Sequence, residues 1–422
     1  MYHKSVLSNG LRVVTAPMPH TRSATVTIFV GAGSRYEADD VAGISHFVEH
    51  MLFKGTARRP TPREISEEIE GVGGILNAAT DREMTVYWAK VPHTSFEPTF
   101  DCLVDMVRNS LFDPAELEKE RKVIIEELNM VHDSPQQLVD LLIDEVVWPH
   151  QPLGRDIAGT KQSVSAISRD HQLEYVRRQY SPGNTVISIA GHVEHDQALA
   201  LADRLFFGWE AREVAPMIPV VDRQVAPRLK LLTKRTEQAH LSISIRALDA
   251  HHPDRYALDL LNIILGEGMS SRLFLEIREN QGLAYDVHSY SSRFQDTGAL
   301  TVYAGVDPKR IDAAIVAVLR ELARFKNEPV STHEFTKAKD LVKGRMLLRL
   351  EDSRAVASSY GNQELLEGEI LTADDLVRII DTVTIEDLQR VAKDLFLDDR
   401  LNLAVVGNYR SEDRFRSLLS LT

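Results

Sequence analysis

Cysteine is almost absent from this chain: Cys102 is the single one among 422 residues. Because an internal disulfide needs two thiols, a disulfide-stabilised fold is excluded, and a small buried apolar side chain is the expected role of Cys102. Long apolar runs are absent too, since none reaches the roughly 18 residues that a membrane-spanning helix requires. Residues 1–9 lack the basic segment and apolar core of a signal peptide. The sequence therefore predicts a cytoplasmic protein with no membrane partner.

An excess of positive charge is also missing. The chain has 49 lysines and arginines against 62 aspartates and glutamates, for a formal net charge of −13. An acidic surface repels polyanions, so neither nucleic acid nor an anionic membrane is an expected partner. The hydrophobic fraction of 43% is ordinary for a globular protein, and the length favours two or three domains.

An internal repeat is the most informative feature that is present. Residues 168–191 have the pattern of a helix followed by a strand that closes on a glycine, and residues 384–407 repeat it at an offset of 216 residues. The same offset, within one residue, relates two further pairs of strand-like segments, 85–87 with 301–303 and 24–30 with 239–245. Near-equal offsets in the same order along the chain predict a duplication.

The two copies are separated by a stretch with the composition of a linker. Residues 209–227 contain three prolines and show no clear periodicity. We therefore expect a metal-binding domain over residues 1–212, a linker over 213–227 and a homologous domain without metal over 228–422.

Predicted strands come in pairs within each copy, for example residues 12–16 with 24–30 and residues 76–80 with 84–90. Pairs of this kind favour antiparallel sheets over a doubly wound parallel sheet. The expected fold class is α+β, with two homologous domains that each hold a mostly antiparallel sheet flanked by helices.

Two histidines on one predicted helix suggest a metal site. Residues 43–55 have a helical pattern that Gly55 is expected to stop. His46 and His50 are four residues apart, so their imidazoles share one face of a helix at a spacing that suits one zinc ion. Glu49 lies on the same face, where it can act as a general base toward zinc-bound water. The pattern H-x-x-E-H is the inverse of the commoner zinc-peptidase motif, and the alternative is a solvated polar helix face.

A two-histidine site needs a third ligand, and an acidic helix after Phe112 offers candidates. Asp113 is the expected N-cap, and Glu120 and Glu127 are two turns apart and share a face. One of them can bind the metal while the other hydrogen-bonds a ligand. Glu126 competes as a ligand, and spacing alone does not decide among these acids.

With this motif and the acidic helix, the chain resembles the pitrilysin/insulinase family of zinc peptidases, the inverzincins. The resemblance is greatest to bacterial relatives of the mitochondrial processing peptidase β subunit. It rests on segments spread over nearly the whole chain: Asn9-Gly10-Leu11, GSRYE (33–37), HFVEHMLFKGT (46–56), GGILNAAT (73–80), ERKVIIEE (120–127), Ser271-Arg272-Leu273 and RENQGLAY (278–285). The family pattern leaves 76 residues between the second histidine and the third ligand, which assigns Glu127 as ligand and Glu120 as its outer-shell acid.

The resemblance also implies roles for other residues. The segment 74–80 is similar to the edge strand to which an extended substrate adds, with Asn77, Ala78 and Thr80 as substrate-binding residues. Tyr285 is implied as a donor to the developing oxyanion, and Arg278 as the residue that orients Tyr285 or the substrate. The family's glycine-rich stretch before Ser-Arg-Leu is interrupted here by Glu267, which departs from the family pattern.

The duplicated half lacks the metal ligands at the repeat offsets, so it is expected to be a partner that closes a chamber. The family also implies a homodimer or a heterodimer with a related chain, one zinc ion per chain, and peptides or unfolded protein segments as substrates. The predicted function is that of a zinc-dependent metalloendopeptidase. The alternatives are a non-catalytic binding or scaffold subunit and a peptidase active only with a second related chain.

Overall fold

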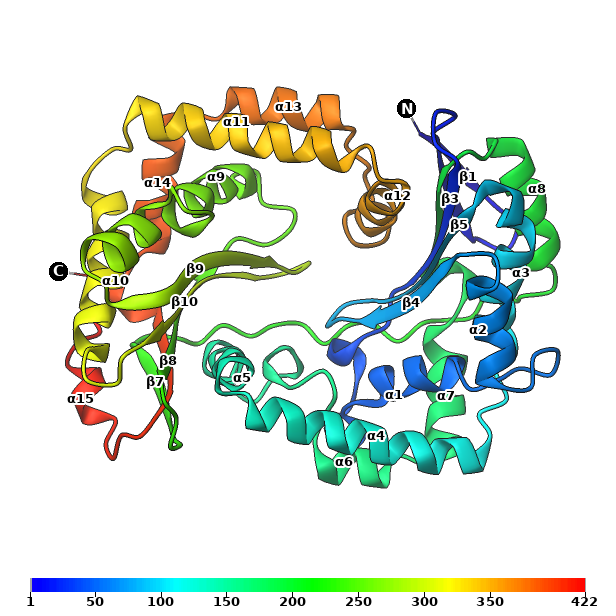
Figure 1. Ribbon diagram of the computed structural model, residues 1–422, viewed down its shortest axis with the longest axis horizontal. Helices are drawn as coiled ribbons and strands as arrows, with labels where there is room; N and C mark the ends of the chain where they lie inside the picture. The colour runs from blue at the N-terminus through cyan, green and yellow to red at the C-terminus, as the bar shows by residue number, and fades with distance from the viewer. Residues whose placement is uncertain (1, 422) are drawn as a thin grey trace. The chain divides into compact units, whose positions relative to one another are not determined.

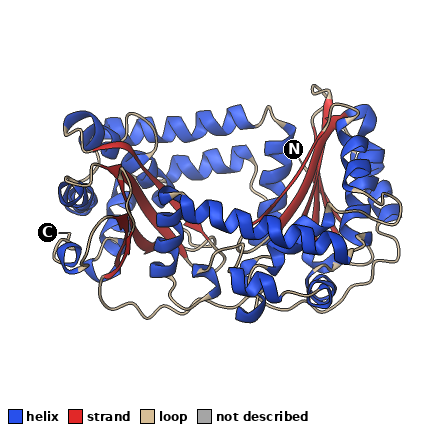
Figure 2. Cartoon of the chain, turned by 60° about the horizontal axis from the view of Figure 1, so that its bottom comes forward, coloured by secondary structure: helices blue, strands red, loops and turns tan. Residues whose placement is uncertain are grey.

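The computed structural model describes residues 2–421, which fold into two compact units. Each unit contains one β-sheet with helices packed on it (Figures 1 and 2). The first unit comprises Met1–Leu128, Asp156–Ile218 and Met346–Thr372, and the second comprises Asn129–Arg155, Pro219–Arg345 and Ala373–Thr422.

The first sheet has six strands in the order β1-β2-β6-β3-β5-β4. Their bounds are β1 His3–Val6, β2 Arg12–Pro17, β6 Thr185–Gly191, β3 Ser23–Val30, β5 Thr85–Pro92 and β4 Ile75–Thr80. Only β2 and β6 run parallel, and the other neighbours are antiparallel. The antiparallel pair β4 and β5 confirms one predicted strand pair.

The other predicted pair in this half is wrong. Strands β2 and β3 are not neighbours, because β6 lies between them and pairs with both. Every residue of β6 is buried, so this strand needs a neighbour on each side and a cover on each face. Strand β6 comes from residues 185–191, far along the chain from β2 and β3, so the pattern of adjacent segments does not reveal it.

The second sheet repeats the arrangement of the first. Its order is β7-β11-β8-β10-β9, with β7 Arg228–Thr233, β11 Leu401–Gly407, β8 Ala239–Ala247, β10 Gly298–Val306 and β9 Ala284–Arg293. As in the first sheet, one pair is parallel, β7 with β11, and the rest are antiparallel. The predicted fold class, two mostly antiparallel sheets flanked by helices, is confirmed.

Most helices pack on the sheet of their own half of the sequence. The first unit contains α1 Ile44–Leu52, α2 Pro62–Glu70, α3 Phe96–Asn109, α6 Lys161–Ala166, α7 Arg169–Gln179, α8 His195–Leu205 and most of α4 Pro114–Asp133. The second contains α9 Arg255–Gly266, α10 Ile311–Asn327, α13 Ala373–Thr382, α14 Ile385–Leu395, α15 Asp413–Arg416 and most of α11 Thr332–Arg349. Cys102 is buried in α3, as expected, and burial raises the pKa of its thiol to about 12.

Each sheet is also covered by an α-helix from the other half of the sequence. Helix α12, Ser353–Asn362, packs on β3 and β6 of the first sheet, and α5, Pro135–Val147, packs on β11 and β8 of the second. Gly361 allows the close approach of α12, because a Cβ there would lie 2.0 Å from the ring of Phe29. The two units therefore differ from the contiguous ranges that the sequence suggested.

The exchange has a physical reason: the helices that are near in sequence cover only one face of each sheet, and α12 and α5 bury the other face. On that face apolar side chains alternate with polar ones, such as Thr25, which contacts Ser353 of α12, and Ser242, which contacts Asp140 of α5. Residues 209–227, expected as a linker, contain no helix or strand, and the boundary between the units falls within them. Among the described residues, no helix has both the length and the apolar character needed to cross a membrane.

Candidate metal-dependent active site

Helix α1 presents two different faces. Phe47, Val48 and Met51 are fully buried in the core of the first unit, while His46 and His50 are only partly buried. The helix ends at Leu52, three residues before the glycine that was expected to stop it. The apolar side therefore fixes the helix in the core and leaves the histidine side open.

The N-terminus of α1 is held by a residue that the sequence argument missed. The buried Glu37 carboxylate accepts the backbone N–H of Gly43 through Oε2 and that of Ser45 through Oε1, each at 2.8 Å. The residue before the helix is Gly43, which has no side chain to cap it. Glu37 supplies this capping charge at the positive end of the helix, directly before His46.

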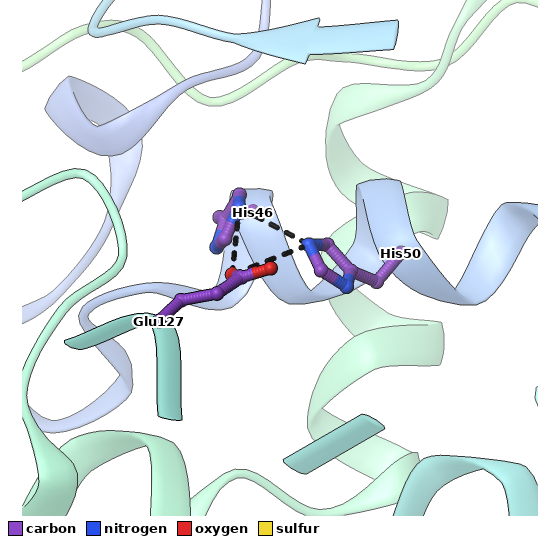
Figure 3. Close-up of side chains that lie close together, drawn as sticks. All are labelled: His46, His50 and Glu127. Carbon is purple, nitrogen blue, oxygen red and sulfur yellow. Dashed lines mark hydrogen bonds and ion pairs between the residues drawn. The ribbon is translucent and has the colours of Figure 1, made fainter. Parts of the chain in front are cut away.

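The three predicted metal ligands meet at one point (Figure 3). Nε2 of His46 and Nε2 of His50 are 3.2 Å apart, and Oε2 of Glu127 lies 3.8 Å from the first and 3.7 Å from the second. Zinc ligands at 2.0–2.1 Å in a tetrahedron are about 3.3–3.4 Å from one another. Within the described part of the chain, this is the only group of three such side chains that could hold a metal.

The protonation state of His46 and the hydrogen-bond geometry of His50 also fit a metal. Burial and the neighbouring His50 lower the pKa of His46 to about 4, so its imidazole is neutral near neutral pH. Nδ1 of His50 lies 3.0 Å from Oε2 of Glu120, the predicted outer-shell acid. A proton on Nδ1 would leave Nε2 of His50 with its lone pair directed toward His46 and Glu127. The donor set therefore suits zinc.

Glu49, the predicted base, has a hydrogen-bond partner that the sequence did not indicate. Its Oε2 accepts a hydrogen bond from the hydroxyl of Thr80 at 2.5 Å. Burial raises the pKa of the Glu49 carboxyl, and the hydrogen bond from Thr80 acts in the opposite direction. Thr80 was predicted as a substrate-binding residue, and the structure shows that its side chain contacts the acid.

Strand β4 forms one edge of the first sheet, and among the described residues no strand pairs with its outer side. Asn77 and Ala78 lie in this strand, next to each other. The side-chain oxygen of Asn77 accepts the backbone N–H of Ala78 at 2.8 Å, which is a local backbone contact. Their predicted contact with substrate stays a prediction.

Arg278 and Tyr285 belong to the second unit. The guanidinium of Arg278 lies between two rings, 4.8 Å from the centre of Phe274 and 4.7 Å from that of Tyr285. Tyr285 is 74% exposed, and both side chains line a cleft of about 680 Å³ in that unit. Arg278 therefore supports the Tyr285 ring by stacking, and the roles of both residues in catalysis stay predictions.

Two charged residues near the Ser-Arg-Leu segment have structural partners. Glu267, the departure from the family pattern, forms an ion pair with Arg345 and accepts a hydrogen bond from Asn262. Arg272 forms a bidentate ion pair with Glu334, with N–O distances of 2.7 and 3.0 Å. These pairs fasten the segment to α11.

Comparison with known families gives two matches that follow one another along the chain. Residues 12–161 match the family described as insulinase (peptidase family M16), and residues 166–342 match the peptidase M16 inactive domain. The Bacillus subtilis protein named "uncharacterized zinc protease YmxG" is 35% identical over 399 residues, covering 94% of this chain and 97% of the relative. A Mycobacterium leprae protein, also named an uncharacterized zinc protease, is 38% identical and covers 97% and 92%.

Solved structures show the same fold at lower sequence identity. A protease from Helicobacter pylori superposes with a TM-score of 0.91 at 22% identity, covering 96% of this chain and 99% of the other. A structure described as a peptidase M16 inactive domain from Pseudomonas fluorescens gives a TM-score of 0.90 at 18% identity, covering 97% and 99%.

Proposed function

This chain belongs to the insulinase family of zinc peptidases, peptidase family M16, and on that premise we propose that it is a zinc-dependent metalloendopeptidase. The observation that carries the proposal is the meeting of His46, His50 and Glu127, with Glu49 on the same helix as the two histidines. A more specific closeness to the mitochondrial processing peptidase β subunit stays a prediction.

The residues of the site divide the work of peptide hydrolysis. His46, His50 and Glu127 would hold zinc, which supplies Lewis acidity that polarises a carbonyl and makes water more acidic. Glu49 accepts the proton of the attacking water and later delivers it to the leaving amine. The raised pKa of Glu49 supports this double role, because it brings the carboxyl closer to neutral pH. Glu120 orients His50, and Thr80 orients Glu49.

Substrate binding is proposed at the edge of the first sheet. The free side of β4 offers backbone donors and acceptors to an extended peptide, which would add as a further strand. This mode depends little on side chains, so it suits peptides and unfolded segments of varied sequence. The residues Asn77 and Ala78 would lie beside the bound peptide, and β4 ends at Thr80, which contacts the proposed base.

The second unit is proposed to assist without binding metal. Tyr285 would donate a hydrogen bond to the developing oxyanion, with Arg278 stacked behind its ring. We further propose a closed chamber, a homodimer or a heterodimer with a related chain, and a cytoplasmic location. The main alternative is a peptidase that is active only with a second related chain. The mass of the active species in solution would distinguish this alternative from a self-sufficient homodimer.

The decisive experiment measures metal and cleavage on the same preparation. The purified full chain, made without chelators, is expected to contain about one zinc per chain by elemental analysis. It should cleave members of an unstructured peptide library, lose that activity with a chelator and regain it with added zinc. A preparation that contains no zinc and takes up none would support a non-catalytic binding subunit instead.

A further inference from the structure

The Glu120 carboxylate has contacts on both of its oxygens. Oε2 lies 3.0 Å from Nδ1 of His50, and Oε1 lies 2.7 Å from Nζ of Lys54. The Glu120 side chain is only 9% exposed, and that of Lys54 is 22% exposed. A nearly buried carboxylate is costly unless charged or polar partners surround it. Lys54 is the cationic partner of this one.

Lys54 reaches Glu120 from just beyond the end of the metal-binding helix. It is four residues after His50, and the chain there still makes helix-like turns, with Phe53 N–H donating to the His50 carbonyl at 3.2 Å and Lys54 N–H to the Met51 carbonyl at 3.1 Å. The imidazole of His50 and the ammonium of Lys54 therefore face the same side, toward α4 and Glu120.

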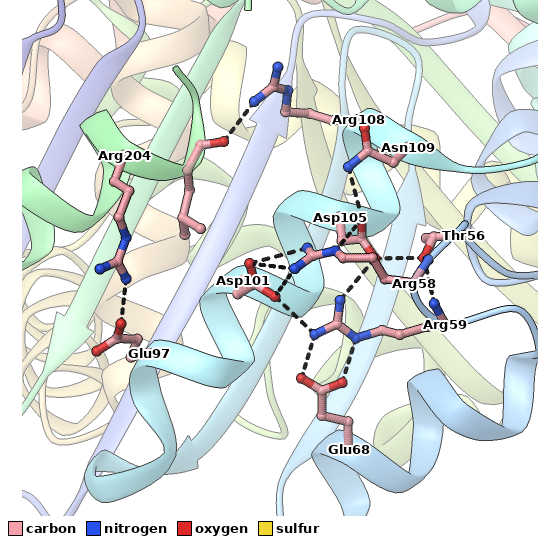
Figure 4. Close-up of polar contacts among 11 residues, drawn as sticks. Thr56, Arg58, Arg59, Glu68, Glu97, Asp101, Asp105, Arg108, Asn109 and Arg204 are labelled. Carbon is pink, nitrogen blue, oxygen red and sulfur yellow. Dashed lines mark hydrogen bonds and ion pairs between the residues drawn. The ribbon is translucent and has the colours of Figure 1, made fainter. Parts of the chain in front are cut away.

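The backbone that follows Lys54 is fixed by a polar network (Figure 4). Thr56 donates its hydroxyl hydrogen to Asp105 at 2.6 Å, and Arg59 donates to Asp105 at 2.8 Å and to Asp101 at 2.9 Å. Asp101 and Asp105 lie on α3, so the segment after α1 is attached to a core helix. The backbone at Lys54 is therefore held in a fixed position relative to α3.

Gly55 is required at the turn that leads into this network. Its φ is +124°, and a Cβ there would lie 2.4 Å from the carbonyl oxygen of Pro60. Its own carbonyl accepts the N–H of Leu111 at 3.0 Å. The turn thus closes tightly immediately after Lys54, which limits the directions in which the lysine side chain can extend.

We infer that Lys54 is a positioning residue of the proposed zinc site and acts through Glu120 on His50; the inference rests on the proposed function. By holding Oε1, the ammonium keeps the carboxylate turned so that Oε2 accepts the Nδ1 proton of His50. That hydrogen bond sets the tautomer and the ring orientation that zinc binding needs. Without Lys54, the carboxylate is free to rotate away from the imidazole.

Zinc affinity is the direct measure, and three variants of the full chain isolate the effect. Lys54→Met removes the charge at similar length, Lys54→Arg keeps a charge, and Lys119→Met removes a lysine next to Glu120 in sequence. Lys119 is 67% exposed and pairs with Glu116 at 2.5 Å, so it is a matched control. Zinc dissociation constants are measured by competition with a chromophoric chelator.

Loss of an outer-shell partner weakens metal binding about 10–100-fold. We expect a weakening in this range for Lys54→Met, recovery of most of it in Lys54→Arg, and wild-type affinity in Lys119→Met. Metal-free Lys54→Met should melt below the metal-free wild type, because the nearly buried Glu120 carboxylate loses its cationic partner, so zinc affinities are compared at a temperature at which both proteins are folded. Equal zinc affinity in Lys54→Met and the wild type, or a lower melting temperature with unchanged zinc affinity, would overturn the inference in favour of an ordinary surface ion pair.

A double mutant tests the route through Glu120. If Lys54 acts only on that carboxylate, adding Lys54→Met to Glu120→Gln should change zinc affinity less than about twofold, because the residues form one unit. The full Lys54 effect in the Glu120→Gln background would overturn the route. A wild-type chain that binds no zinc would instead contradict the proposed function itself, so the two failures are distinguishable.

Discussion

Thr80 donates its hydroxyl hydrogen to Oε2 of Glu49 at 2.5 Å, which joins the last residue of β4 to the open face of α1. The hydroxyl of Thr85 lies 3.5 Å from that of Thr80 and donates to the carbonyl of Ala32 at 2.8 Å. The edge strand proposed for substrate and the acid proposed as base are therefore attached to each other. This attachment fixes the direction of the Glu49 carboxylate.

Replacing Thr80 should slow catalysis while leaving zinc in place. A hydrogen bond to a charged group contributes about 1.5–3 kcal/mol, so Thr80→Val is expected to lower kcat roughly tenfold or more through misplacement of Glu49. Thr80→Ser retains the hydroxyl and should keep most of the activity. Steady-state kinetics with a fluorogenic peptide, together with zinc content, provide the check. Equal kcat in the valine and wild-type proteins would contradict the positioning role.

Removing the proposed base should separate metal binding from chemistry. Glu49→Gln preserves the size of the side chain but cannot accept a proton, so cleavage should fall by about 10²–10⁴-fold, the typical contribution of general acid–base catalysis. Zinc content should remain that of the wild type. Cleavage by Glu49→Gln at the wild-type rate would show that another group takes the proton.

The third ligand can be tested against its neighbour in the sequence. Glu127→Gln is expected to lose zinc and activity together, because a neutral amide oxygen is a much poorer ligand than a carboxylate. Glu126→Gln makes the same chemical change one residue earlier, at an exposed position, and should behave like the wild type. Elemental analysis and chelator competition would decide, and the reverse pattern would exchange the roles of these acids.

The Glu37 carboxylate should make a large contribution to the free energy of unfolding of the first unit. Glu37→Ala leaves the N–H groups of Gly43 and Ser45 without their acceptor, and an unsatisfied buried donor costs about 1–3 kcal/mol. We expect the free energy of unfolding, measured by chemical denaturation, to fall by about 2–4 kcal/mol. Thr61→Ala, which removes the exposed cap of α2, should cost only about 1 kcal/mol.

The pair of Arg272 and Glu334 predicts a pH-dependent stability. The hydrogen bonds from Arg272 lower the pKa of Glu334 from 4.5 to about 2. A depressed carboxyl pKa stabilises the folded state above the unfolded pKa, and this stability is lost as the pH falls through the folded pKa. Glu334→Gln should therefore be less stable than the wild type by about 1–2 kcal/mol near neutral pH, and the difference should shrink between about pH 4.5 and 2.

Urea denaturation at several pH values checks this prediction. Glu328→Gln is a suitable control, because that side chain is 62% exposed and lies 3.6 Å from its arginine partner. It should show a small difference from the wild type with little change across the same pH range. A Glu334→Gln difference that stays constant down to about pH 2 would contradict the assigned cause.

The central features of the site follow from spacing in the sequence. The i, i+4 relation of His46 and His50 requires only that residues 44–52 form a helix, and an apolar face makes that helix predictable. The acids on α4 could be proposed for the same reason, since two turns of helix bring Glu120 and Glu127 to one side. Choosing Glu127 required the family resemblance, because helical periodicity does not tell which partner a face meets.

The missed contacts share one physical property: they depend on where separate segments meet. Glu37 precedes α1 by several residues and reaches back to cap it, Thr80 lies on a strand 31 residues after Glu49, and Lys54 meets an acid 66 residues away. No local pattern encodes these pairs. The insertion of β6 between β2 and β3 escaped prediction for the same reason, because neighbours in a sheet need not be neighbours in sequence.

The origin of α12 has a consequence for how the chain folds as it is made. All strands of the first sheet have left the ribosome once residue 191 has emerged, yet the helix that covers Val14, Phe29 and Val186 ends only at residue 362. At about 5–20 residues per second, this interval lasts roughly 10–30 s. During that time the nascent chain leaves these apolar side chains uncovered on one face of the sheet, so a gene fragment that ends after the first sheet should yield aggregates rather than a folded unit.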